Sequence, residues 1–289
     1  MLQTWRKWLG IAILLALAVI SCRRIFLRQF EPKFLTTGPN GPQTPGSLGV
    51  AYQRVKIPSH TRTLDAYAVV APASCQPKVA LLIFHGVQET ISEWVKAQRF
   101  LYDHCVSSVV FDYSGHGDSS RPGTIQNLNQ DALAAYSWFA SWAGDGTQLS
   151  ILGHSMGNGP MLEALRSFRP APASVVVANA FSSLRDEGKQ SRSLRGPLRL
   201  LLYIMPDEWN NVRNVSQNRV PLLLVHSDAD SVNPIAMGRR IFEAAPQPKQ
   251  MIVLHGFKHN ALYKDPNERW WLPILQFLRG ESPDHNRKT

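Results

Sequence analysis

The stretch GHSMG, residues 153–157, indicates the fold of this 289-residue chain. It follows the apolar run Gln148–Leu152, which we expect to be a strand, and it opens a run of helical period towards Arg166. Strand, sharp turn and helix form the context in which the pattern G-x-S-x-G presents a serine on an elbow. The flanking glycines leave room for neighbouring backbone, because the serine adopts a strained turn. We therefore predict that Ser155 is a nucleophile.

Short β-rich runs alternate with runs of helical period on both sides of this stretch. Val79–Phe84 reads VALLIF, a continuous apolar run that is typical of a strand buried on both faces. The other expected strands are 52–57, 64–70, 108–111, 148–152, 174–178, 222–225 and 251–254, and the clearest helices are 92–102, 128–142, 234–244 and 270–278. About six alternations predict an α/β fold, with a mostly parallel central sheet and helices on both faces.

A serine hydroxyl is a weak nucleophile until a base takes its proton. After such an elbow, the acid and then the histidine are expected at later strand ends. Two aspartates, Asp228 and Asp230, follow the strand 222–225. Asp228 is closer to that strand, whereas Asp230 precedes the start of the next helix, and we favour Asp230 as the acid.

Two histidines follow the next strand, 251–254. His255 sits directly at the strand end, whereas His259 lies in the loop that must fold over the serine. We favour His259 as the base, and His255 remains the alternative. The joint occurrence of serine, acid and histidine in this order is more specific than any one of the motifs.

Acyl transfer also needs N–H donors that stabilise the oxyanion. The residue after the nucleophile, Met156, supplies one backbone N–H group. The second is expected from the loop after 79–84, which reads His85-Gly86-Val87. Gly86 allows a close approach of the backbone, and we predict Val87 as the donor. We expect His85 to brace this turn as a structural histidine.

Five motifs together resemble the α/β-hydrolase superfamily: FHG (84–86), DYSGHGDS (112–119), GHSMG (153–157), HSDADSVNP (226–234) and GFKHN (256–260). The resemblance covers roughly residues 50–280 and is nearest to membrane-anchored, monoacylglycerol-lipase-like or serine-aminopeptidase-like members. It implies an α/β-hydrolase fold with Ser155 as nucleophile, Asp230 as acid and His259 as base. The chain departs from the family pattern at Asn158 and Ser227, where glycine is common. Asn158 puts the helix packing behind the elbow in doubt.

The charge of the chain is concentrated at its N-terminus. Up to Phe34 there are six basic residues and one acidic residue, so half of the net charge of +10 lies there. The basic residues bracket an apolar stretch, which indicates a membrane rather than a nucleic acid as partner. The composition, 44% hydrophobic and 18% charged, is that of an ordinary globular protein.

The apolar stretch itself is Leu9–Ile20. It is short for a helix that crosses a bilayer, which needs about 20 residues, and it has the length of the apolar part of a secretion signal. Residues 19–22, VISC, resemble a bacterial lipobox with Cys22 as the lipidated residue. The arginines that follow oppose export. We predict that residues 1–34 attach the chain to a membrane, as a lipoprotein-type signal or a signal anchor, on either side of the membrane.

The remaining organisation follows from composition. Residues 35–49 are rich in Pro, Gly, Ser and Thr and are expected to be a linker or an irregular lead-in, 50–280 the hydrolase domain, and 281–289 a polar tail. Residues 184–219 are too long for a usual connection. Leucines and arginines at helical spacing predict that this insertion is a helical lid with an apolar inner face; the alternative is a peripheral helix pair.

These features predict a serine hydrolase that cleaves a carboxylic ester or thioester through an acyl-serine intermediate. No motif for a metal or an organic cofactor is found. We expect an acyl lipid or another small apolar ester as substrate. The alternatives are an aminopeptidase-like amidase and a membrane-bound binding protein that keeps the triad without catalysis, since the superfamily includes both kinds.

Two cysteines remain if Cys22 belongs to the anchor. Cys75 lies just before the strand 79–84, and Cys105 just before the strand 108–111. In the arrangement that the resemblance implies, these strands are neighbours, so a disulfide is feasible, and it would persist in an oxidising compartment. The arginines after the apolar stretch favour the alternative, two reduced cysteines in a domain that faces the cytoplasm.

Overall fold

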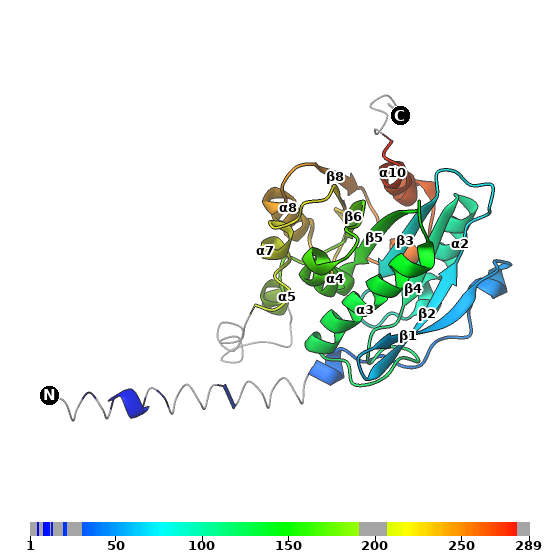
Figure 1. Ribbon diagram of the computed structural model, residues 1–289. Coiled ribbons are helices and arrows are strands. Elements are labelled where there is room, and N and C mark those ends of the chain that lie inside the picture. Colours follow the sequence, from blue (N-terminus) through cyan, green and yellow to red (C-terminus); the bar gives the residue numbers. More distant parts are fainter. Residues whose placement is uncertain are drawn as a thin grey trace.

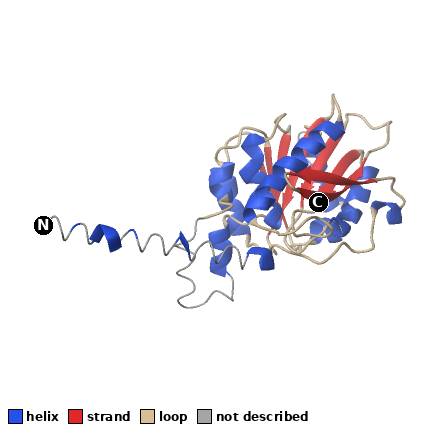
Figure 2. Cartoon of the chain, turned by 60° about the horizontal axis from the view of Figure 1, so that its bottom comes forward, coloured by secondary structure: helices blue, strands red, loops and turns tan. Residues whose placement is uncertain are grey.

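The computed structural model describes residues 31–190 and 207–281, together with residues 5, 8–11, 13, 20 and 21. An eight-stranded sheet runs through it in the order β1-β2-β4-β3-β5-β6-β7-β8. The pairs β1–β2 and β2–β4 are antiparallel, and all other pairs are parallel. Helices cover both faces of the sheet (Figures 1 and 2). The predicted α/β class and the mostly parallel sheet are confirmed.

The bounds of the elements are as follows. The strands are β1 Gln53–Ser59, β2 Arg62–Val69, β3 Val79–Phe84, β4 Val106–Phe111, β5 Gln148–His154, β6 Ser174–Ala178, β7 Leu222–Ser227 and β8 Lys249–Leu254. The described helices are η1 Pro45–Leu48, η2 Ile91–Trp94, α2 Val95–Asp103, α3 Ile125–Ala143, η3 Ser155–Gly157, α4 Asn158–Ala164, η4 Leu165–Ser167, α5 Leu184–Gln190, α7 Asn211–Val215, α8 Ile235–Ala244, α9 Ala261–Lys264 and α10 Glu268–Leu278.

The central strand β3 divides its side chains between two cores, because successive side chains of a strand point to opposite faces. Ala80, Leu82 and Phe84 pack with α3, α4 and α8. The alternate residues of β3, Val79, Leu81 and Ile83, pack on the other face with α2, α9 and α10. The continuous apolar pattern of β3 is the consequence of burial on both faces.

Several strands are longer than hydropathy predicts. β7 continues through the polar residues His226 and Ser227, which pair with Val253 and Leu254 of β8. β5 likewise continues to His154, which pairs with Ala178 of β6. Pairing of main-chain groups does not depend on side-chain polarity, so a pattern of apolar residues ends before the strand does. The extensions bring polar side chains to the carboxyl edge of the sheet.

The segment 35–49 is docked on the domain and is not a free linker. The side chain of Leu35 joins the core, and Thr37 donates a backbone hydrogen bond to Gly115 O at 2.9 Å. The side chain of Asn40 donates to Asp65 Oδ2 at 3.2 Å. Pro45–Leu48 form a short helix that is capped by Thr44. The Pro- and Gly-rich composition therefore marks irregular structure here rather than an independent spacer.

The N-terminal segment lies largely outside the described residues. Of the predicted anchor 1–34, the structure describes Gly10, Ser21, Glu31–Phe34 and six apolar side chains that are exposed to solvent: Trp5, Trp8, Leu9, Ile11, Ile13 and Ile20. Among the described residues, no helix is both long enough and apolar enough to cross a membrane. Most of the polar tail 281–289 is also outside the described residues.

A disulfide joins Cys75 to Cys105. The neighbouring strands β3 and β4 pair in parallel from Val79 and Val106 onwards, and the two Cα atoms lie 5.3 Å apart at the amino edge of the sheet. Of the two states left open by the sequence, the structure therefore has the bridge.

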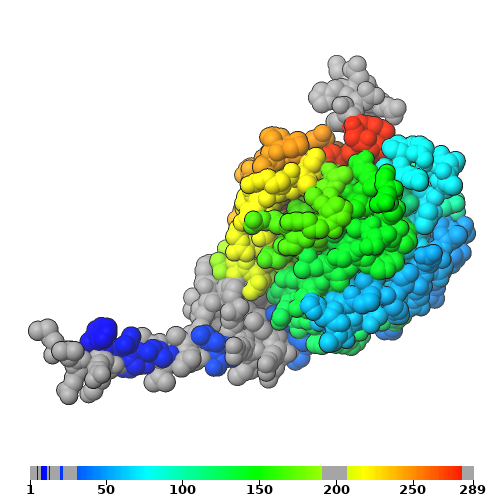
Figure 3. All heavy atoms as spheres, viewed as in Figure 1, coloured from blue at the N-terminus to red at the C-terminus, as the bar shows by residue number. Residues whose placement is uncertain are grey.

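Within the insertion 184–219, the first described residues contact the residue at which the described chain resumes, Asp207. The backbone N–H of Arg185 donates to Asp207 Oδ1 at 3.3 Å. From Asp207 onwards the chain packs into the core: Trp209 is buried, and a Cβ atom on Gly159 would lie 2.5 Å from the Trp209 ring. In the space-filling view the yellow segment lies against the green surface around α4 (Figure 3). The predicted leucine- and arginine-rich helix, 192–204, is outside the described residues.

Candidate active site

Ser155 is on a strained turn between β5 and α4. Its φ angle is 52°, in the left-handed region that residues with a Cβ atom rarely adopt. The flanking glycines are required by close packing. A Cβ on Gly157 would overlap the backbone oxygen of Phe84, and one on Gly153 would lie 2.6 Å from Asn158 Oδ1. The elbow is thus wedged against the carboxyl end of β3.

His259 and Asp230 are brought to Ser155 by the loops after β8 and β7. His259 Nε2 lies 2.9 Å from Ser155 Oγ, and His259 Nδ1 lies 2.7 Å from Asp230 Oδ2. The three side chains come from positions 104 and 29 residues apart in the sequence. They form one continuous row of hydrogen bonds, in which Asp230 orients the imidazole and the imidazole faces the serine hydroxyl.

The carboxylate of Asp230 is built to stay ionised. Burial raises its pKa, but the hydrogen bond and charge of His259 and the N–H groups of Val232 and Asn233 outweigh this and hold the pKa below its usual value. Both N–H groups donate to Oδ1, at 2.8 and 2.9 Å. Oδ2 therefore remains available to His259.

The rival residues Asp228 and His255 pair with each other and not with the serine. His255 Nδ1 lies 2.7 Å from Asp228 Oδ2, and Gly256 N–H donates to Asp228 Oδ1 at 2.9 Å. The His255 side chain is 78% exposed. The structure therefore groups Ser155 with Asp230 and His259, the residues favoured from the sequence.

The loop after β3 lies directly beside the elbow. A Cβ atom on Gly86 would overlap Glu89 Oε1 and would lie 3.2 Å from Ser155 Cβ, so glycine favours this close approach. The next residue, Val87, donates its backbone N–H to no residue in the described part of the chain. His85 is fully buried, with Nδ1 2.8 Å from Gly86 O. The loop thus has a backbone N–H group, that of Val87, close to the serine. The sequence predicts this group as the second oxyanion donor, with Met156 as the first.

The two departures from the family pattern both carry hydrogen bonds. The amide of Asn158 donates to Ser155 O and Ala178 O, each at 3.0 Å. The hydroxyl of Ser227 donates to Phe257 O at 2.5 Å. Asn158 ties the elbow to the end of β6, and Ser227 ties the acid-bearing loop to the histidine-bearing loop. Neither substitution disturbs the elbow.

Three polar residues that the sequence did not single out surround this row. His154, inside the elbow, contacts Glu89 through Nδ1 at 3.1 Å and His259 O through Nε2 at 3.0 Å. Asn179, at the end of β6, donates to the same His259 oxygen at 2.8 Å. In the sequence, the only indications of this cluster were Glu89, four residues after His85, and His154, directly before the nucleophile.

A further carboxyl group, Glu187 of α5, belongs to the insertion. Burial raises its pKa to about 6, and the negative charge of Asp230 adds to this rise. Its Oε2 atom is buried and has no hydrogen-bond partner among the described residues. Glu187 therefore places a titratable group within electrostatic reach of Asp230.

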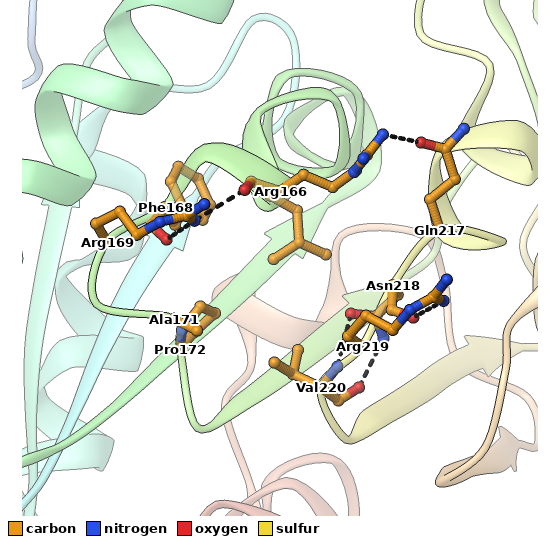
Figure 4. A pocket seen from close by; sticks show the side chains of 10 residues that line it. Arg166, Phe168, Arg169, Ala171, Pro172, Gln217, Asn218, Arg219 and Val220 are labelled. Carbon is orange, nitrogen blue, oxygen red and sulfur yellow. Dashed lines mark hydrogen bonds between the residues drawn. The ribbon is translucent and has the colours of Figure 1, made fainter.

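A pocket of about 440 Å³ lies elsewhere, before the amino ends of β6 and β7. Arg166, Arg169 and Arg219 line it, and Arg166 reaches across to Gln217 Oε1 at 2.5 Å (Figure 4). Ser155 follows the carboxyl end of β5, at the opposite edge of the sheet. In the described part of the chain, no group of three or more His, Cys, Asp or Glu side chains is placed to hold a metal ion.

Comparison with known proteins supports this fold. A family model described as "alpha/beta hydrolase fold" matches residues 79–192. The lysophosphatidylserine lipase ABHD12 of Macaca fascicularis is 27% identical over 206 residues, which cover 61% of this chain and 49% of that protein. An uncharacterized protein of Mycobacterium tuberculosis is 28% identical over 182 residues, 63% of each chain. The chain thus spans about half the length of the lipase relatives it matches.

The solved structure of the esterase Pf2001 of Pyrococcus furiosus has the same fold. It superposes with a TM-score of 0.67 at 19% identity, and the match covers 84% of this chain and 99% of that one. The predicted resemblance to the α/β-hydrolase superfamily is confirmed: the chain has the α/β-hydrolase fold and is similar to lipases and esterases.

Proposed function

We propose that the protein is a serine hydrolase that cleaves carboxylic esters of acyl lipids through an acyl-serine intermediate. The observation that carries the proposal is the row Ser155 Oγ, His259 Nε2 at 2.9 Å, and His259 Nδ1 with Asp230 Oδ2 at 2.7 Å. A hydroxyl with a base in reach, itself oriented by a carboxylate, is the arrangement of an activated nucleophile.

In the proposed mechanism, His259 takes the Ser155 proton as the oxygen attacks the acyl carbonyl. The backbone N–H groups of Val87 and Met156 stabilise the oxyanion that forms. The protonated His259 then gives its proton to the leaving group, and it activates a water molecule to release the acyl group. Asp230 remains ionised and stabilises the imidazolium.

An apolar acyl chain is proposed for two reasons. Val87 and Val232, on the loops that flank the row, are 40% and 47% exposed, and solvent-exposed aliphatic side chains at a site suit an apolar ligand. The similarity to a lysophosphatidylserine lipase points to a lipid with a single acyl chain. Residues 184–219 are proposed as a lid over the acyl chain, because the insertion is longer than a usual connection and its residue Glu187 is within electrostatic reach of Asp230.

Membrane attachment through residues 1–34 is part of the proposal. The described apolar side chains of this segment are exposed to solvent in the structure, and a surface of that kind calls for an apolar environment. Fractionation of cells that express the chain with and without residues 1–34 tests this, since loss of the segment should release the protein from the membrane fraction.

The experiment that tests the function has two steps. A fluorophosphonate probe should label wild-type protein and not Ser155→Ala, because the probe reacts quickly only with an activated serine. A panel of p-nitrophenyl esters, single-chain glycerophospholipids and aminoacyl anilides then separates ester from amide cleavage. Faster turnover of anilides would establish an amidase, and absence of labelling would establish a binding protein.

A further inference from the structure

The side chain of His154 lies beneath the histidine-bearing loop, between two hydrogen-bond acceptors. Its Nδ1 atom is 3.1 Å from a Glu89 carboxylate oxygen, and its Nε2 atom is 3.0 Å from the backbone oxygen of His259. A backbone oxygen can only accept, so Nε2 must carry a proton. The open question is whether Nδ1 carries one too.

The environment of Glu89 answers this question. Its Oε2 atom accepts the backbone N–H of Gly86 at 2.8 Å and the indole N–H of Trp94 at 2.9 Å. Two N–H donors on one carboxyl oxygen favour the ionised form. An ionised carboxylate accepts only, so Nδ1 must donate to Oε1 and His154 holds both protons.

Shifts in pKa agree with this state. Burial raises the pKa of Glu89, but the charge and hydrogen bond of His154, together with the charge of His85 and the N–H group of Gly86, outweigh burial and lower it to about 2. Burial lowers the pKa of His154, but Glu89, together with the His259 backbone oxygen and the charge of Asp230, outweighs this and raises it above its ordinary value. The pair is enclosed, with side-chain exposures of 0% for His154 and 6% for Glu89, where charges interact strongly.

We propose, given the function proposed above, that the buried His154 imidazolium is a positioning residue that holds the base by donating to the backbone oxygen of His259. Asn179 is the second donor to that oxygen, at 2.8 Å. Asn179 also accepts from Ser227 N–H at 3.1 Å. His259 is thus fixed from the elbow and from the end of β6, so its imidazole is held between Ser155 and Asp230.

Several groups surround the His154–Glu89 pair, and one of them is the buried His85: burial lowers the pKa of His85, but Asp112 and Glu89 outweigh this and raise it. The Tyr263 ring of α9 lies 5.5 Å from the His154 ring between centroids, and burial raises its pKa, so it stays neutral. The Trp94 ring of η2, at 5.8 Å, does not titrate. The centroid of the His259 ring is 5.1 Å from that of His154. The negative charge of Asp230 also raises the pKa of His154.

The sign of the pH effect follows from the raised pKa of His154. The charge is present at neutral pH and is lost as pH rises through that pKa. The proton leaves from Nε2, because Nδ1 faces the carboxylate. The Nε2 lone pair then faces the His259 oxygen, and two acceptors repel each other. We therefore expect kcat to fall at alkaline pH in the wild type.

Glu89→Gln separates the charge from the hydrogen bond. The amide oxygen can accept from Gly86 and Trp94, and the amide NH₂ group can donate to Nδ1, which leaves the Nε2 proton on a neutral His154. This variant should keep kcat within about 10-fold at neutral pH, because a neutral hydrogen bond replaces a charge-assisted one. Its alkaline fall in kcat should be absent, because burial keeps His154 neutral across the range.

His154→Phe removes the donor, and we expect kcat for p-nitrophenyl acetate to fall about 10- to 100-fold, with KM little changed. Because an unpaired buried carboxylate can prevent folding, the double variant Glu89→Gln/His154→Phe is measured beside it. His104→Phe is the matched control: His104 Nδ1 also contacts a backbone oxygen, that of Phe100 at 2.8 Å, far from the site.

The outcomes are distinct. The positioning role is established by three results together: a low kcat in the folded double variant, an unchanged kcat in His104→Phe, and no fall of kcat at alkaline pH in Glu89→Gln. Wild-type kcat in the double variant, or an unchanged alkaline fall in Glu89→Gln, overturns it. If the wild type fails to react with a fluorophosphonate, the proposed function fails instead, and the two failures are told apart.

Discussion

Two histidine–aspartate pairs stand side by side on the same two loops of this molecule. His255 with Asp228 and His259 with Asp230 have the same nitrogen–oxygen distance, 2.7 Å. The first pair has side chains 78% and 41% exposed, and the second 11% and 0%. Only the second continues to a serine, at 2.9 Å. A short contact alone therefore does not indicate a catalytic pair; enclosure and a third partner do.

The largest difference is expected when each histidine is removed. We expect His259→Ala to lower kcat on p-nitrophenyl acetate by about 10⁵-fold, because serine and base act as a unit. His255→Ala should change kcat less than about twofold, since its partner is in solvent. Circular dichroism of both variants controls for folding. Comparable losses from the two substitutions would contradict the distinction.

The aspartates give the second contrast. Asp230→Asn keeps the shape but removes the charge that orients and stabilises the histidine, and about a 10³- to 10⁴-fold loss in kcat is expected. Asp228→Asn should leave kcat almost unchanged. Single-turnover labelling by a fluorophosphonate gives an independent measurement. A more damaging Asp228→Asn would mean that the acid has been assigned to the wrong loop.

A third contrast concerns the tie between the loops. The Ser227 hydroxyl donates to Phe257 O at 2.5 Å and accepts from Ala229 N–H at 3.2 Å. Ser227→Ala leaves the half-buried Phe257 oxygen without this donor, and we expect a loss of about 1 kcal/mol in the free energy of unfolding, with a several-fold drop in kcat. Urea titration and p-nitrophenyl acetate turnover measure the two effects. Stability lost without any change in kcat would show that the tie does not position the histidine.

Much of this arrangement was predictable because it depends on local pattern. The apolar run of β3, the elbow glycines and the order of serine, acid and histidine are all visible in the sequence, and the predicted fold is confirmed. The preference for Asp230 over Asp228 used only the position of the next helix. The structure groups Asp230 with the serine, while its catalytic role stays a prediction that the variants above test.

The remaining features depend on contacts between distant segments. Glu89 is in a loop and His154 is an unspecified position of the elbow motif, so nothing in the sequence shows that they form a buried pair 65 residues apart. The disulfide depended on which strands are neighbours, and that order is a property of the sheet. Docking of residues 35–49 is likewise invisible in a Pro- and Gly-rich composition.

The smallest expected effect concerns Glu187, whose charge acts on the buried pair and not on the exposed one. Its pKa in the fold, about 6, is above the ordinary value of 4.5. Between these values the folded state binds more protons than the unfolded state, so stability falls as pH rises. We expect Glu187→Gln to raise the free energy of unfolding by about 1 kcal/mol at pH 8, where the carboxylate is ionised, and by almost nothing at pH 4, where both side chains are neutral. Urea titrations at the two pH values measure this difference, with Glu163→Gln on the exposed face of α4 as control. An equal gain at both pH values would assign the effect to packing rather than to charge near Asp230.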